Sequence, residues 1–434
     1  MPQRLDRTSP GFEAAFQRLL DAKHAPGEDV RATVKGILAD VRARGDAALV
    51  AYTERFDGVT LAPDAFRVTP AEFAAAERAV GPDLRCALEF AALRIEDYHR
   101  RQLPEDLDYR DEAGVRLGYR WRPLAAVGVY VPGGTAVYPS SVLMNAIPAR
   151  IAGVKRIAMT VPTPKGVLNP LLLVAAKIAG VTEIYRLGGA QAIAALAYGT
   201  ENVCAVDKIV GPGNVYVAEA KRQVFGQVGI DMIAGPSEIL ILADGANDPA
   251  WIAADLLSQA EHDPAAQAIL MTDDREFAAK VEAAIEDALQ SLERAEIART
   301  SWEANGVIVF LDRLEDAIPL IDRLAPEHLE LAIEDADAFA ALVRNAGAIF
   351  IGRFTPEALG DYVAGPNHVL PTARSARFSS GLGVLDFLKR TSFVACGEAA
   401  LDRLAPAAEV LATAEGLDAH ARSLRLRMSR PKGG

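Results

Sequence analysis

Short apolar runs alternate with helical stretches from about residue 124 onward, and this alternation limits the fold more than any other feature of the sequence. The runs are short and mostly rich in β-branched residues, which is typical of buried strands: AAVGVYV, RIAMTVP, EIYRLGG, KIVGPG, EILILAD, QAILMTDD, GVIVFLD and AIFIG. Most of them are separated by helical segments such as NPLLLVAAKIAG. Strands that alternate with helices predict parallel sheets built from βαβ units. About eight strands fit two such sheets better than one.

The domain organisation follows from length and from two turns. A chain of 434 residues is too long for one ordinary core. Two loops rich in glycine and proline, residues 130–134 and 235–238, resemble crossings between domains. We therefore expect two Rossmann-like α/β domains, one inserted in the other, with a helical segment at each end of the chain. The expected parts are a helical segment at 1–25, a discontinuous domain at 26–130 and 237–380, an inserted domain at 131–236 and a helical tail at 381–434.

Composition and charge limit the partners and the compartment. The formal net charge is −12 and the cations are scattered among acids, so no nucleic-acid partner is expected. We find no signal-peptide pattern and no run of about 18 apolar residues, and therefore expect no membrane span. Cys86, Cys204 and Cys396 lie far apart and form no disulfide framework, which favours a reducing, cytoplasmic location.

Six histidines are the first candidates for chemistry. His24 and His99 lie in the helical N-terminal part among charged residues, and we expect both at the surface or at a domain boundary. The other four lie beside carboxylates, amides or tight turns: His262, His328, His368 and His420.

Two of these histidines have a candidate partner within three residues in the sequence. Gln259 and His262 are three apart on a helix that Pro264 would end, so both side chains can reach one ion. The plain alternative is a polar helix end. Glu327 and His328 follow a proline, and histidine can take a hydroxyl proton near neutral pH. The alternative for this pair is the first turn of a helix, where a glutamate suits the dipole.

The other two histidines lie in a loop and in the tail. Asp361 starts an expected irregular loop that contains His368, and such loops usually carry function. The alternative is an Asp that caps a turn. Glu415 and His420 lie in the tail, where an amphipathic helix face is the alternative.

Together, Gln259, His262, Asp361 and His420 form a set of nitrogen and oxygen ligands without cysteine. Sets of this kind are typical of reactive zinc sites, whereas structural zinc sites are usually rich in cysteine. Spacing alone does not establish the set, because its members come from three distant segments.

Nucleotide binding has weaker support from the residues. The GxGxxG fingerprint is absent. Three glycine-rich turns follow expected strands, and two lead directly into helices, where a helix N-terminus can hold an anion: YVPGGTAVYPSS, RLGGAQAIAALAYG and IVGPGNVYVAEAKR. Ordinary βα turns would look the same, so both interpretations stay open on these residues alone.

Taken in order, several segments resemble the signature segments of the histidinol dehydrogenase family, and the resemblance covers nearly the whole chain: VGVYVPGGTAVYPSSVLMNAIPARIAGV, RLGGAQAIAALAYGT, DKIVGPGNVYVAEAKRQVFG, IDMIAGPSEILILAD, LLSQAEHDPAAQ, APEHLEL, GDYVAGPNHVLPT and EGLDAHARS. The resemblance implies NAD-dependent oxidation of L-histidinol to L-histidine through histidinal, with two NAD reduced, at the end of histidine biosynthesis. It also implies a homodimer whose C-terminal segments cross to complete each other's sites.

The resemblance further implies a role for each matching residue. The zinc ligands, which also contact substrate, would be Gln259, His262, Asp361 and His420. The catalytic pair would be Glu327 and His328, with His328 also on the substrate. Further substrate contacts would be Ser237, His368 and Glu415, and the NAD contacts would be Tyr130, Gln191 and Asn214. Most zinc and catalytic residues would then lie in the discontinuous domain, and the NAD contacts in or next to the inserted one.

Two other functions remain to be separated from this one. A related zinc- and NAD-dependent dehydrogenase could act on another small polar alcohol. A two-lobed binding protein could capture a metal or metabolite without chemistry, but the Glu327–His328 pair would then have no purpose.

Overall fold

The computed structural model describes residues 2–21, 28–133, 138–233 and 235–429. The chain divides into two compact units, each described by itself below. Unit 1 takes residues 1–102 and 125–387, and unit 2 takes residues 103–124 and 388–434. No described helix is long and apolar enough to cross a membrane.

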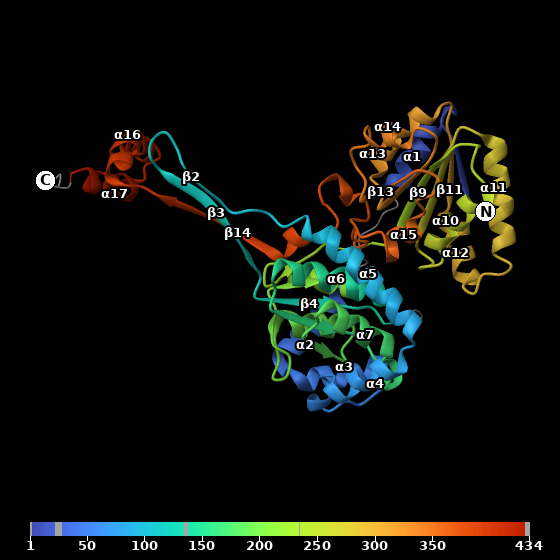
Figure 1. Cartoon of the computed structure of the whole chain (residues 1–434), viewed down its shortest axis with the longest axis horizontal. Helices are drawn as coiled ribbons and strands as arrows, with labels where there is room; N and C mark the ends of the chain where they lie inside the picture. The colour runs from blue at the N-terminus through green and yellow to red at the C-terminus, as the bar shows by residue number, and fades with distance from the viewer. Residues whose placement is uncertain (1, 22–27, 134–137, 234, 430–434) are drawn as a thin grey trace. The chain divides into compact units, whose positions relative to one another are not determined.

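A six-stranded parallel sheet forms one half of unit 1, in the order β1-β11-β10-β9-β12-β13 (Figure 1). Its strands are β1 (Gln3–Asp6), β9 (Glu238–Ala243), β10 (Gln267–Thr272), β11 (Val307–Phe310), β12 (His328–Ala332) and β13 (Ala348–Ile351). In β9, Leu240 and Leu242 face one apolar core and Ile239 and Ile241 face another. Both faces are covered, which explains why the sequence of β9 is a continuous apolar run.

Two helical layers cover this sheet. On the side of Leu240 lie α1 (Phe12–Asp21), α13 (Ile318–Leu324) and α14 (Ala336–Ala340). On the side of Ile239 lie α10 (Pro249–Ala260), α11 (Arg275–Ala288) and α12 (Ala295–Asn305). The short helix α15 (Glu357–Tyr362) follows β13.

A five-stranded parallel sheet forms the other half of unit 1, in the order β6-β5-β4-β7-β8. Its strands are β4 (Ala126–Tyr130), β5 (Arg156–Thr160), β6 (Glu183–Tyr185), β7 (Lys208–Val210) and β8 (Gly229–Ile230). The helices between them are α6 (Pro139–Ala152), α7 (Pro170–Ala179), α8 (Gly189–Tyr198) and α9 (Val215–Val224). The predicted fold class, two parallel α/β sheets with their helices, is confirmed.

The N-terminal helices pack on this five-stranded half. They are α2 (Glu28–Arg44), α3 (Asp46–Asp57), α4 (Pro70–Ala79) and α5 (Pro82–Arg100). Helix α2 contacts α8 and α9, α4 contacts α7, and α5 contacts α6. Residues Val34 and Leu38 share one apolar core with Ala158 of β5. The packing thus groups these helices with the sheet of residues 126–230, and not with residues 237–380 as expected from the sequence.

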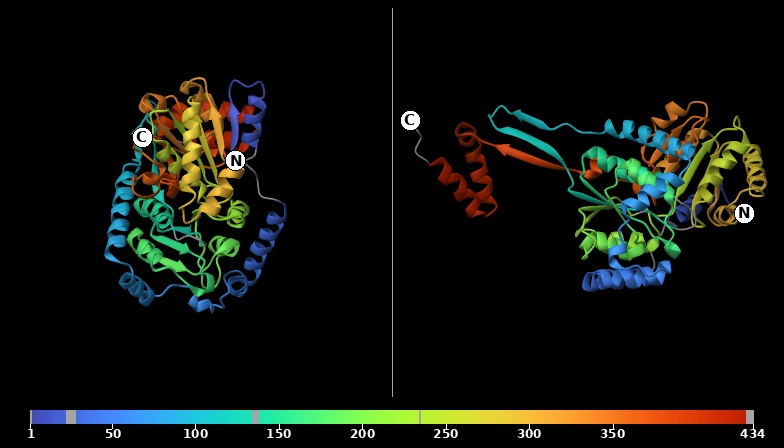
Figure 2. Two further views of the ribbon diagram at one scale, coloured as in Figure 1. Left: turned by 90° about the vertical axis from the view of Figure 1, so that its right-hand side faces the viewer. Right: turned by 60° about the horizontal axis from the view of Figure 1, so that its bottom comes forward.

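Unit 2 is a long antiparallel ribbon that leads to a pair of helices (Figure 2). The ribbon consists of β2 (Leu107–Arg110), β3 (Arg116–Pro123) and β14 (Leu388–Ala395), and the helices are α16 (Glu398–Ala414) and α17 (Asp418–Met428). The helices of the tail were predicted, but β14 was not. These strands are largely exposed and rich in arginine, so they lack the apolar alternation by which strands are recognised.

Two smaller expectations were wrong. The segment 1–25 is not only helical, because β1 joins the edge of the six-stranded sheet beside β11. His99 is fully buried, and its Nδ1 lies 2.7 Å from the carbonyl oxygen of Ile95. His24 lies outside the described residues, as do residues 134–137 after the first predicted domain crossing. Short 3-10 helices complete the fold at Pro63–Ala65, Pro164–Gly166, Leu314–Ala317, Ser375–Arg377 and Val384–Phe387.

The turn after β7 requires a glycine at position 211. Gly211 has φ +111°, and a Cβ there would collide with the carbonyl oxygen of Tyr130 on the neighbouring strand. Gly226 has a similar φ of +100°, with nothing within 4 Å of a Cβ. We expect Gly211→Ala to destabilise the protein by about 2–4 kcal/mol, and Gly226→Ala by about 1–2 kcal/mol from the backbone alone.

Thermal unfolding of the two variants measures the difference. Both substitutions strain the backbone alike, so Gly226→Ala is the control for the collision with β4. Equal midpoints for the two variants would show that β4 and the turn after β7 are not packed as described.

Candidate active site

The predicted catalytic pair lies at the amino end of the six-stranded sheet. His328 is the first residue of β12, and its neighbours in the ladder are Ile239 of β9 and Ala348 of β13. The pair therefore belongs to a strand, and the alternative of a first helical turn is wrong. Glu327 and His328 are 6% and 4% exposed.

The hydrogen bonds of His328 define which nitrogen can act as a base. Its Nδ1 lies 2.9 Å from the carbonyl oxygen of Glu238, which can only accept, so Nδ1 carries the proton. Its Nε2 is buried and has no hydrogen-bond partner in the part of the chain that the structure describes. Burial lowers the pKa of His328 to about 4. The ring is therefore neutral at pH 7, with a free lone pair on Nε2.

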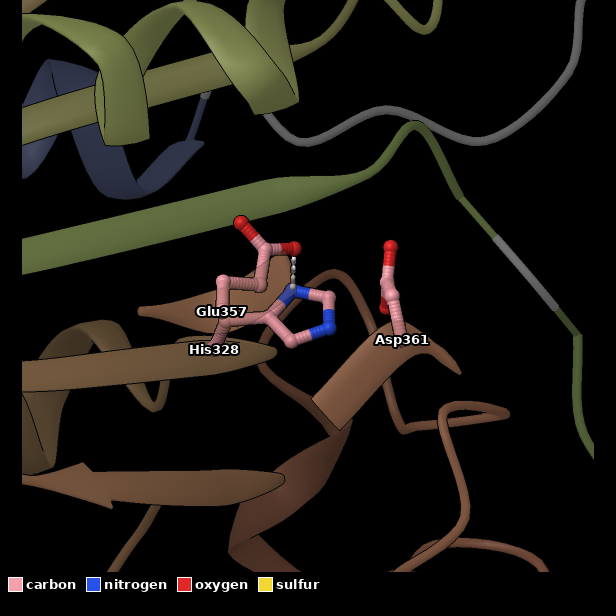
Figure 3. A group of neighbouring side chains, drawn as sticks. All are labelled: His328, Glu357 and Asp361. Carbon is pink, nitrogen blue, oxygen red and sulfur yellow. Dashed lines mark ion pairs between the residues drawn. The ribbon is translucent and has the colours of Figure 1, made fainter. Parts of the chain in front are cut away.

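Asp361 lies beside this imidazole, with two further histidines nearby. One ligand atom each of His328, Glu357 and Asp361 lie within 4.8 Å of one another (Figure 3). The Asp361 carboxylate opposes the fall in the pKa of His328, whereas His368 and His262 add to it through their charges. The Nδ1 of His368 lies 3.1 Å from the carbonyl oxygen of Asp361. Asp361 lies in the last turn of α15, so the predicted irregular loop that contains His368 is present but begins two residues later, at Val363.

Gln259 and His262 sit where α10 ends. Gln259 is 1% exposed, and its Oε1 has no hydrogen-bond partner among the described residues. His262 lies in the turn that follows, and its N–H donates to the carbonyl oxygen of Gln259 over 3.2 Å. A buried amide oxygen without a partner is costly unless a ligand satisfies it. This orphaned oxygen, with the nearby Asp361 and His262, fits a metal ion with nitrogen and oxygen ligands.

Glu327 and Ser237 flank Glu238. Oε2 of Glu327 accepts a hydrogen bond of 2.9 Å from the N–H of Glu238, and lies 3.8 Å from Nδ1 of His328. The carbonyl oxygen of Ser237 accepts from the N–H of Gln267, which starts β10. The Ser237 side chain is half-buried at the same edge of the sheet.

The glycine turns gather at the carboxyl edge of the five-stranded sheet. Tyr130 ends β4, and its hydroxyl accepts a hydrogen bond of 3.1 Å from the N–H of Gly189 at the start of α8. Burial raises the pKa of Tyr130 to about 12, so the phenol keeps its proton. Gln191 of α8 is 1% exposed, with an Oε1 that has no partner in the described ranges.

The glycines of these turns pack closely against Pro162 at the same edge of the sheet. A Cβ on Gly133 or on Gly188 would collide with the ring of Pro162, so only glycine fits these turns. Asn214 caps α9, and its Oδ1 accepts from the N–H groups of Tyr216 and Val217, both over 3.1 Å. A cradle of glycine turns before two helix N-termini, with an orphaned amide, fits a dinucleotide at the carboxyl ends of parallel strands.

Glu415 and His420 belong to unit 2. Glu415 caps the C-terminus of α16, His420 lies in α17, and both are exposed. Unit 1 by itself thus brings together His262, His328, Asp361 and His368, while the two tail residues are described apart from them.

Sequence comparison decides the family. The sequence model of the histidinol dehydrogenase family matches residues 21–428. The chain belongs to the histidinol dehydrogenase family. It is therefore an oxidoreductase. A histidinol dehydrogenase of Rhodospirillum rubrum is 62% identical over 431 residues, covering 99% of each chain. One of Ruegeria pomeroyi is 59% identical over 433 residues, covering 100% of each.

The fold of a solved family member agrees. The crystal structure of histidinol dehydrogenase from Elizabethkingia anophelis matches with a TM-score of 0.92 at 36% identity, covering 98% of each chain. The family resemblance seen in the sequence is confirmed.

Sequence reasoning missed a group of buried carboxyls close to the predicted catalytic pair. Glu357 and Glu330 are each 2% exposed, and Glu330 donates a side-chain hydrogen bond to Asp255 of α10. The pKa of Glu330 is raised to about 9, mainly by burial and in addition by the neighbouring Asp255. One signal was available: Glu330 is a lone acid inside the apolar strand HLELA, and such a residue must be neutral or paired.

The raised pKa of Glu330 predicts that the protein loses stability as pH rises. Its folded pKa is raised above the ordinary 4.5, so the folded protein holds a proton that the unfolded chain releases. The contribution of this bound proton to the free energy of unfolding is complete below about pH 4.5 and is lost as pH rises toward about 9. The unfolding midpoint should fall by several degrees between pH 6 and pH 9, and fall less in Glu330→Gln. Identical pH dependence in both proteins would contradict the buried neutral carboxyl.

Proposed function

We propose that the protein oxidises L-histidinol to L-histidine through histidinal, with zinc bound and two NAD reduced. The observation that carries the proposal is the buried, neutral His328, whose free Nε2 lies near the half-buried Asp361, His262 and His368. Such a base, beside residues able to hold a cation, suits removal of a hydroxyl proton from a positioned alcohol.

Gln259, His262 and Asp361 would hold the zinc, together with His420 of the partner subunit. When bound, zinc supplies a positive charge that can anchor the nitrogen atoms of histidinol. Ser237 and His368, with Glu415 of the partner subunit, would contact the rest of the substrate. These residues fix the carbinol carbon, and positioning of this kind can supply a large part of the rate.

The two members of the catalytic pair would act in different half-reactions. His328 takes the hydroxyl proton on Nε2 during oxidation of the alcohol, while Nδ1 keeps its bond to the Glu238 carbonyl. Glu327 then takes a proton from the water that adds to the bound aldehyde. Tyr130, Gln191 and Asn214 would hold NAD at the carboxyl edge of the five-stranded sheet, and NAD supplies the hydride acceptor for each step.

The overall reaction is tested by following NADH with L-histidinol and quantifying histidine. We expect two NADH per histidine, loss of turnover on chelation, and its return on adding zinc. No turnover by zinc-loaded protein would refute histidinol as the substrate; turnover of another small polar alcohol in the same assay would then identify a relative with a different substrate.

Separate substitutions should divide the two half-reactions. Glu327→Gln should slow oxidation of supplied histidinal by roughly 100-fold or more, with less effect on the alcohol step. His328→Asn should slow the alcohol step by a similar factor. Single-turnover NADH formation from each substrate measures both. If Glu327→Gln slowed neither step, Glu327 would not be the base for hydration.

Sharing of the tail between subunits can be tested with two inactive variants. In a homodimer with exchanged tails, a subunit with His262→Asn and one with His420→Asn form one intact site per mixed dimer. Refolding them together in equal amounts should restore about a quarter of the normal activity, because about half the dimers are mixed. Mixing His262→Asn with Asp361→Asn is the control and should restore none. Without recovery in the first mixture, each site takes its tail residues from its own chain.

A further inference from the structure

We propose that Glu357 is a positioning residue for the catalytic base: its carboxyl group packs against Nδ1 of His328, beside the carbonyl of Glu238, and keeps the ring turned so that Nε2 faces the Asp361 side. The inference rests on the proposed role of His328 in alcohol oxidation. It assigns a function to a residue that the signature segments of the sequence do not mark.

The contact is direct and buried. Oε1 of Glu357 lies 3.2 Å from Nδ1 of His328, and the Glu238 carbonyl oxygen lies 2.9 Å from the same nitrogen. Nδ1 of His328 thus lies against two oxygen atoms, one from β9 and one from α15. The bond to the Glu238 carbonyl fixes the tautomer, and the Glu357 carboxyl packed beside it limits rotation of the ring. The ring of Phe350 lies 6.0 Å from the imidazole, centroid to centroid, and limits it further.

Helix α15 places residues on both sides of this ring (Figure 3). Glu357 and Asp361 are four apart in α15 and so share one face of the helix. Glu357 points at Nδ1, while Asp361 stands on the side of the other ring nitrogen. One turn of α15 therefore sets the distance between Glu357, which contacts the base, and Asp361, a proposed zinc ligand.

Glu357 lies among several other carboxyls. Burial is the largest cause that raises its pKa, and the carboxyls of Asp361, Glu327, Glu330 and Asp255 also raise it. A carboxyl group offers an acceptor oxygen in either protonation state, so the positioning role does not depend on the titration of Glu357. A glutamine side chain can provide the same oxygen at the same reach, whereas a methionine of similar length cannot.

The test is a double-mutant cycle between Glu357 and His328 in the zinc-loaded full-length protein. Glu357→Met should lower kcat for histidinol about 10- to 100-fold, with KM and bound zinc within about twofold of normal. Glu357→Gln should retain at least about a third of kcat. In a His328→Asn background, Glu357→Met should cause no further loss, because its effect acts through the ring. Glu330→Gln, in a neighbouring carboxyl that does not contact His328, is the control and should keep kcat.

Three results would overturn the assignment. They are an unchanged kcat in Glu357→Met, an equal loss in both backgrounds, or a loss of bound zinc that accounts for the loss of rate. If Glu357→Met does not fold, Glu357→Ala takes its place in the same cycle. A fully active His328→Asn protein would instead refute the proposed role of His328 itself, so the two failures are distinguishable.

Discussion

The backbone of Glu238 bonds to both residues of the proposed catalytic pair, Glu327 and His328, and much of the site depends on these two bonds. Its N–H donates to Glu327 Oε2, and its carbonyl oxygen lies against Nδ1 of His328. Both bonds run across the first rung of the ladder between β9 and β12, where His328 stands opposite Ile239. Because that ladder lies between inner strands of a sheet covered on both faces, the pair is held by buried backbone. The side chain of Glu238 also bonds to the backbone: its Oε1 accepts a hydrogen bond from the N–H of Ala373.

The two sheets use opposite edges. Ligands of open α/β sheets usually bind outside the carboxyl ends of the strands. The proposed NAD site on the five-stranded sheet would follow that rule, with Tyr130 at the end of β4 and Gln191 and Asn214 after β6 and β7. The proposed catalytic site on the six-stranded sheet would not, since Ser237 precedes β9 and Glu327 precedes β12. Asp361 reaches this amino edge because the chain turns back after β13 through α15.

Much of the architecture could be predicted because buried parallel strands carry a strong apolar signal, as in β9 and β10. The ribbon of unit 2 could not, because its exposed strands are polar on most positions. In the site, histidines near acids or amides marked three segments that the fold brings together, those of His262, His328 and His368. Ligand chemistry suggested the grouping of Gln259 with Asp361, but their separation of over a hundred positions could not establish it, and the family resemblance was needed to imply it. Glu357 was missed because a glutamate near a helix start is ordinary in sequence, and only packing shows that it is buried against His328.

The position of the site at the amino edge leaves the opposite edge of the six-stranded sheet with no proposed role in chemistry. The loop after β11, with the exposed Asp312, lies at that carboxyl edge, a full strand length from the rung that holds His328. Loops at such an edge can lengthen without moving the ladder. This loop is therefore a natural attachment point, where an inserted peptide could anchor the enzyme to a surface while the buried pair keeps its geometry.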